Sequence, residues 1–177
     1  MIFLNTPRLV LRNVSEKDVP IIFDYRNHPA CARYQRGQTK DLPGITALVQ
    51  RRQNDALSVE NNCMVAVALR DTDEMVGEII VMPNEGTISL GYTFSYRHHR
   101  KGFAFEALSS LIAHLHADYP ERDFISFVEP ENAASIGLLK KLGYRDLGYL
   151  PAITSQAFGL YTTPVTEKEI SEAIAKQ

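Results

Sequence analysis

The chain has 177 residues, of which 45% are hydrophobic and 23% are charged. These values exclude a disordered or fibrous protein and predict one globular domain spanning residues 1–177. Lys and Arg number 19 against 21 Asp and Glu, so no basic excess indicates a nucleic-acid partner. Two widely separated cysteines exclude a disulfide scaffold, and no apolar stretch suits a signal peptide or a bilayer span. We therefore expect a soluble, cytoplasmic protein with no membrane partner.

The first half of the chain predicts one strand, two helices and then three strands. Residues 9–11 are short, apolar and β-favouring. Asp18 is expected to cap a helix that runs from Val19 to about residue 28, because Pro20 is tolerated in a first turn. Apolar spacing predicts a second helix over about 43–57. Turn-forming residues then separate three runs, which predict an antiparallel meander over residues 64–69, 75–81 and 87–94.

The second half alternates helices and strands. An apolar stripe with a 3.6-residue period predicts the strongest helix over residues 103–118. The elements expected after it are a strand at 124–128, a helix at 133–142 that ends at Gly143, strands near 144–150 and 157–163, and a helix at 167–176. This order predicts a mixed α/β (α+β) domain with about seven strands and four to five helices. The last helix would pack on the domain or at a homodimer contact.

The segment from His99 to Ala107 carries the clearest chemistry. A strand that enters a turn with small residues at Gly102 and Ala104, and then a helix, directs unpaired backbone N–H groups at one point. The helix dipole, Arg100 and Lys101 add positive charge there. This pattern indicates a phosphate site, and the alternative is an ordinary basic loop before a helix. Neither a Walker A loop nor a GxGxxG motif occurs in the sequence.

Four short motifs follow one another along the chain, at residues 90–92, 99–107, 132–135 and 141–144, after an opening strand at 6–12. In this order they resemble the GCN5-related N-acetyltransferases (GNAT family), and within them the branch of the ribosomal-protein N-terminal (alanine) acetyltransferases. The resemblance covers nearly the whole chain.

The resemblance implies a central sheet that splays open to admit acetyl-CoA as cosubstrate. No metal is expected, because His114 and His116 are two apart on a helix and do not face each other, and no cysteine or carboxylate spacing completes a site. It further implies that residues 99–104 wrap the pyrophosphate, that the preceding strand binds the pantetheine arm through its backbone, and that the residue after the next strand contacts the cofactor. The implied cofactor-binding residues are Tyr92, Thr93, Phe94, His99, Arg100, Lys101, Gly102, Phe103, Ala104 and Asn132.

The catalytic groups are less complete than the cofactor motif. Ser135 matches a position proposed in this branch to protonate the departing thiolate, although it could equally be a helix-start hydroxyl. Leu139 stands where many relatives have a tyrosine acid, which excludes that acid here. Ser89 stands where relatives often have an acidic residue, so the general base is unassigned. Glu78 is either a distant base or a surface carboxylate. His99 replaces the usual Gln, Arg or Trp, which is expected to alter cofactor affinity.

The expected function is direct transfer of an acetyl group to a primary amine, because a thioester needs no covalent nucleophile. The acceptor would be a protein N-terminus or a small-molecule amine. An α-amine, with a pKa near about 8, suits a site without a strong base better than a lysine near about 10. The alternative is a catalytically weak module of the same fold that binds and senses acetyl-CoA. Basic residues between 33 and 53 either attract an acidic acceptor or form a solvated face.

Overall fold

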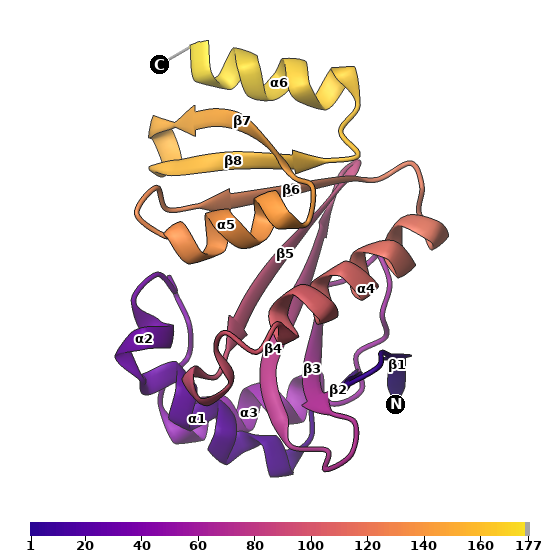
Figure 1. Cartoon of the computed structure of the whole chain (residues 1–177), viewed down its shortest axis with the longest axis vertical. Coiled ribbons are helices and arrows are strands. Elements are labelled where there is room, and N and C mark those ends of the chain that lie inside the picture. Colours follow the sequence, from indigo (N-terminus) through magenta and orange to yellow (C-terminus); the bar gives the residue numbers. More distant parts are fainter. Residues whose placement is uncertain (176–177) are drawn as a thin grey trace.

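The computed structural model describes residues 1–175, which form one open sheet with helices on its faces (Figure 1). The sheet has eight strands in the order β1-β2-β3-β4-β5-β6-β8-β7. All neighbours are antiparallel except β5 and β6. The strands are β1 (Ile2–Asn5), β2 (Leu9–Asn13), β3 (Cys63–Leu69), β4 (Met75–Asn84), β5 (Thr87–Phe94), β6 (Asp123–Val128), β7 (Arg145–Leu150) and β8 (Ser155–Leu160).

Six α-helices accompany the sheet in the described part of the chain. They are α1 (Val19–Asn27), α2 (Pro29–Ala32), α3 (Leu42–Arg52), α4 (Phe103–Asp118), α5 (Ala133–Lys141) and α6 (Pro164–Ala175). The described residues also form three short 3-10 helices, η1 (Glu16–Asp18), η2 (Tyr96–His98) and η3 (Pro151–Ile153). No helix among residues 1–175 is long and apolar enough to cross a bilayer.

The N-terminal half of the sheet is buried on both faces. Along β3, Val65 and Val67 join a core with α4, whereas Met64 and Ala66 join a second core with α1 and α3. Because side chains alternate between faces, a strand covered on both sides is a continuous apolar run. This explains why residues 63–68 are nearly all hydrophobic and all buried.

The sheet opens between β5 and β6. These parallel strands pair only at their beginnings, through Thr87 with Asp123 and Ile88 with Phe124. Beyond this point they diverge, and Figure 1 shows β6, β8 and β7 turning away from the long strands β3, β4 and β5. The remaining edge of β5 therefore has no strand partner on that side, and a gap opens in which α5 begins.

The predicted meander, the long helix and the splayed mixed sheet are confirmed, and several details differ. The sheet has eight strands instead of seven, because the four-residue edge strand β1 is too short to be predicted from its sequence pattern. The helix at 43–57 ends at Arg52, and the last helix begins at Pro164. Its predicted residue 176 lies outside the described residues. The last helix packs on the domain, where Ile174 lies against Gly148 of β7.

The predicted cap of α1 was wrong. The side chain of Asp18 makes no capping hydrogen bond to α1. Its carboxylate instead accepts hydrogen bonds from the backbone N–H of Ser15 and from both Nη atoms of Arg12, at 2.8–2.9 Å. A buried guanidinium is a stronger partner than a helix N–H, so this carboxylate joins β2 to the start of α1.

Candidate active site

A cavity of about 990 Å³ occupies the gap between β5 and β6. Its walls are the free edge of β5, the ends of β6 and α5, the start of α4, and the segment that follows α2. The cavity wall combines apolar and aromatic side chains with nearly as many polar and charged ones.

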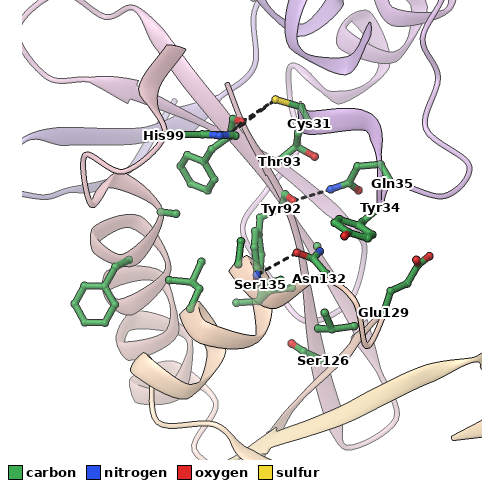
Figure 2. A pocket seen from close by; sticks show the side chains of 18 of the residues that line it. Cys31, Tyr34, Gln35, Tyr92, Thr93, His99, Ser126, Glu129, Asn132 and Ser135 are labelled. Carbon is green, nitrogen blue, oxygen red and sulfur yellow. Dashed lines mark hydrogen bonds between the residues drawn. The ribbon is translucent and has the colours of Figure 1, made fainter. Parts of the chain in front are cut away.

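The free edge of β5 carries backbone carbonyls that side chains now satisfy. Gln35 Nε2 donates to the Tyr92 carbonyl at 3.1 Å, and His99 Nε2 donates to the Phe94 carbonyl at 2.8 Å. Cys31 Sγ donates to the same Phe94 carbonyl at 3.3 Å. Figure 2 shows these contacts along the strand. Because the donors are side chains rather than a strand, a ligand with amide groups can replace them by a rotation of those side chains.

The start of α4 points an uncapped helix end into the cavity. Gly102 is the N-cap residue, with a φ of 81°, and no side chain among residues 1–175 bonds to the first-turn N–H groups. A left-handed φ at this point favours glycine. Phe103, Ala104 and Phe105 of this first turn line the cavity, and so does Arg100. An uncapped N-terminus of a 16-residue helix beside a cation binds anions well.

Glu106 fixes this helix end to the N-terminal strand region. Its carboxylate accepts hydrogen bonds from Thr6 Oγ1 at 2.6 Å and from Arg8 Nε at 2.6 Å and Arg8 N at 2.9 Å. Arg8 also donates to the Lys101 carbonyl at 2.9 Å. Partial burial raises the pKa of Glu106, but these hydrogen bonds outweigh it, and the pKa lies below its usual value. The anion-binding turn is therefore held in place from outside the cavity.

A pair of hydroxyls faces the cavity between β5 and α5. Tyr92 Oη and Ser135 Oγ are 2.7 Å apart, and either can donate. Asn132 caps α5, since its Oδ1 accepts from the Ser135 backbone N–H at 3.2 Å. Burial raises the pKa of Tyr92, and its hydrogen bond with Ser135 offsets only part of that effect. Both hydroxyls thus remain protonated at neutral pH. Leu139 lies in the core, 1% exposed.

The structure gathers nearly all the predicted site residues around this one cavity. Ser135 and nine of the ten predicted cofactor residues line it. Lys101 does not, and its Nζ lies 3.5 Å from His98 Nδ1. The sequence did not single out Tyr34, Gln35 or Glu129 as site residues, although they also line the cavity.

One of the two interpretations of Glu78, that it is a surface carboxylate, was wrong. Glu78 is 0% exposed and lies on β4, where it pairs with Thr93 of β5 and contacts α1. Arg26 Nη2 donates to it at 2.6 Å and Tyr25 Oη at 2.8 Å. Burial raises the pKa of Glu78, while Arg26 and Tyr25 counteract that rise. The network continues through Gln38, which donates to Thr93 Oγ1 at 2.9 Å. Glu78 does not line the cavity. Its contacts join β4 to α1, and Gln38 extends them to β5.

Comparison with known proteins identifies the family. The family model of the Acetyltransferase (GNAT) domain matches residues 8–145. The chain is 28% identical over 151 residues to a protein named Uncharacterized N-acetyltransferase p20 of Bacillus licheniformis, covering 83% of this chain and 84% of that relative. It is 26% identical over 148 residues to Uncharacterized N-acetyltransferase YnaD of Bacillus subtilis, covering 82% of this chain and 84% of the relative.

Solved structures share the fold. An acetyltransferase (GNAT family) from Bacillus anthracis superposes with a TM-score of 0.77 at 20% identity, covering 90% of this chain and 98% of that one. RimL, a ribosomal L7/L12 α-N-protein acetyltransferase in complex with coenzyme A, gives 0.73 at 16% identity, covering 90% and 97%. The chain therefore belongs to the GNAT acetyltransferase family. It is an acyltransferase of the acetyl-CoA-dependent class.

Proposed function

We propose that the protein transfers the acetyl group of acetyl-CoA directly to a primary amine, a protein N-terminal α-amine or a small-molecule amine. One observation carries the proposal: an uncapped helix N-terminus and an unpaired strand edge line the same cavity. The first suits the pyrophosphate and the second suits the amide groups of a pantetheine arm. RimL, a structure with the same fold, is in complex with coenzyme A.

The cofactor-binding residues divide by the part of the ligand they suit. The first-turn N–H groups of α4, with Arg100 and the turn from His99 to Ala104, would hold the pyrophosphate. The carbonyls of Tyr92 and Phe94 would bond the pantetheine amides, replacing the donors Gln35 and His99. Asn132, at the start of α5, would close the other side of the arm. These residues fit acetyl-CoA because they supply N–H donors for its phosphates and carbonyl acceptors for its amides.

The chemistry needs a neutral amine held against a thioester carbonyl and a proton for the sulfur that leaves. The thioester is itself the activated acyl donor, so this chain need not supply a covalent nucleophile. Ser135 is proposed as the group that gives a proton to the departing sulfur. Tyr92 is hydrogen-bonded to it at 2.7 Å and would relay to it the proton that the acceptor nitrogen loses as the amide forms, so that both hydroxyls end protonated. A general acid of this kind accounts for about 10²- to 10⁴-fold in rate.

The acceptor nitrogen is proposed to be an α-amine rather than a lysine side chain. Glu78 is buried on β4 and paired with Arg26. The carboxylate that does line the cavity, Glu129, is paired with Arg36 at 2.7 Å. The described residues of this wall therefore include no unpaired carboxylate that could act as a strong base. An amine with a pKa near about 8 is partly neutral at pH 7 without such a base, whereas a lysine near about 10 is not.

The release of free thiol from acetyl-CoA tests this function. Two acceptors are compared at pH 7: Ala-Ala-Ala amide, which offers only an α-amine, and Nα-acetyl-lysine amide, which offers only a side-chain amine. We expect steady thiol release with the first and at least about tenfold slower release with the second, as the difference in amine pKa requires. Faster release with the lysine compound contradicts the α-amine preference. Binding of acetyl-CoA without thiol release by any amine contradicts acetyl transfer itself.

A further inference from the structure

The cavity has one acidic residue among the described residues that line it, Glu129. The cationic or imidazole side chains along the same wall are Arg36, His98, His99, Arg100 and Lys141. All of these except Arg36 belong to the segment around α4 or to the end of α5, near the proposed pyrophosphate site. Glu129 follows the last residue of β6, where the two halves of the sheet have diverged. A single carboxylate at this point selects for positive charge.

The Glu129 carboxylate already forms an ion pair with the Arg36 guanidinium. Arg36 Nε lies 2.7 Å from Glu129 Oε1, and Arg36 also donates to the Ile153 carbonyl at 3.3 Å and to Thr154 Oγ1 at 3.2 Å. No other cation among residues 1–175 lies within 4.0 Å of the Glu129 carboxylate. The Arg36 side chain is 61% exposed and the Glu129 side chain is 27% exposed. An ion pair with one partner largely in water is weak, so another guanidinium can displace Arg36 readily.

Glu129 does not lie at the hydroxyl pair. In Figure 2, Tyr92 and Ser135 lie on one side of Asn132, whereas Glu129 and Tyr34 lie on the other side. Exposed apolar side chains, Phe127 and Ile153, line the cavity as well. The nitrogen that attacks the thioester has to be neutral and has to approach the hydroxyl pair. The charge that Glu129 can hold is therefore a second charge, on another part of the acceptor.

We propose that Glu129 recognises a guanidinium group carried by the acceptor, which takes the place of the Arg36 side chain. This inference rests on the proposed function. The acceptor class is an α-amine with an arginine-like group nearby, such as a peptide with arginine at its first or second position. A planar guanidinium can donate two parallel hydrogen bonds to a carboxylate. Arg36 donates one to Glu129, through Nε at 2.7 Å, while its Nη atoms donate to Ile153 and Thr154. In the absence of an acceptor, Arg36 thus occupies the place proposed for the guanidinium of the acceptor.

Matched arginine and citrulline peptides test this proposal, because citrulline keeps the shape of arginine and loses its charge. Thiol release from acetyl-CoA is measured with Arg amide, Ala-Arg amide and their citrulline counterparts, using wild type, Glu129→Gln and Arg36→Met. For wild type we expect kcat/KM for one arginine compound to exceed that for its citrulline counterpart at least about tenfold. Glu129→Gln is expected to raise KM for the arginine compound until this preference is lost. Arg36→Met preserves or increases the preference, because it removes the competitor.

Other outcomes overturn the proposal. Equal rates for arginine and citrulline compounds at both spacings contradict it, as does an equal fall of all rates in Glu129→Gln, which would indicate a base or a structural role. Faster release with Ala-Glu amide, lost in Arg36→Met, would make Arg36 the recognition residue for an acidic acceptor. If no compound releases thiol, the proposed function fails. Calorimetry of Ala-Arg amide with the acetyl-CoA complex then decides: binding that Glu129→Gln weakens supports recognition, and no binding refutes it.

Discussion

Replacement of Arg26 by methionine is expected to destabilise the protein strongly. Arg26 and Glu78 form a buried ion pair, with side-chain exposures of 4% and 0%. The guanidinium donates to Glu78 through Nη2 at 2.6 Å and Nε at 3.1 Å, and to the Thr39 carbonyl at 3.1 Å. Methionine preserves much of the volume but leaves the carboxylate without a counter-charge. Breaking a buried pair in this way costs about 3–5 kcal/mol, a large part of the about 5–15 kcal/mol that stabilises a typical domain.

Urea unfolding followed by circular dichroism measures this loss. The corresponding thermal midpoint should fall by about 6–20 °C for a chain of this length. The double variant Arg26→Met/Glu78→Gln should lose less than Arg26→Met, since it removes the uncompensated charge. Arg97→Met is the matched control, because Arg97 pairs with Asp24 at 3.1 Å on the surface, and it should unfold like wild type. If Arg26→Met is no less stable than Arg97→Met, the argument from the buried charge is wrong.

Ser135→Ala and Tyr92→Phe probe the cavity wall, and Glu106→Gln probes the contact outside the cavity that holds the start of α4. Ser135→Ala and Tyr92→Phe should each lower kcat by about 10²-fold or more if the pair delivers a proton, with acetyl-CoA binding unchanged in calorimetry. Because burial raises the pKa of Tyr92, the wild-type rate should not fall on the alkaline side below about pH 10. A decline in rate between pH 7 and 9 would argue against this pair. Glu106→Gln should lower the free energy of unfolding by about 1.5–2 kcal/mol, the lower part of the range for hydrogen bonds to a charged group, as measured by urea unfolding at pH 7. Since the folded pKa of Glu106 lies below its usual value, the stability it provides is present above about pH 4.3 and is lost as pH falls through the folded pKa; an unchanged difference between wild type and Glu106→Gln at pH 3 would contradict this.

The sequence predicted those parts of the fold that depend on local periodicity. The strands β3, β4 and β5 alternate or run continuously apolar, and α4 shows a clear 3.6-residue stripe, so their bounds were close to those observed. Gly143 marked the end of α5, and it has a left-handed φ of 93°. By contrast, β1 is a short edge strand whose pairing with β2 depends on contacts rather than on its own pattern. Its existence could not be predicted from four residues.

The site divides in the same way. The anion-binding turn from His99 to Ala104 is local, since the chain itself forms the strand, turn and helix start in sequence. The opposite wall depends on residues far apart in the chain: Arg36 meets Glu129 across 93 positions, and Gln35 meets Tyr92 across 57. Nothing in the sequence near position 36 indicates such a partner. The ion pair also affects the interpretation of the basic residues between 33 and 53, because the charge of Arg36 is neutralised by the Glu129 carboxylate.

Acetyl-CoA binding by calorimetry tests the central claim most directly, with wild type, Ala104→Glu and Ala113→Glu. Ala104 lies in the first turn of α4 and lines the cavity, whereas Ala113 is exposed on the same helix. Position 104 is preferable to Gly102, whose φ of 81° would strain any other residue. We predict micromolar binding by wild type and Ala113→Glu, and no binding by a folded Ala104→Glu, whose carboxylate repels the pyrophosphate. Equal binding by all three proteins, or no binding by folded wild type, would contradict the assignment of this cavity to acetyl-CoA.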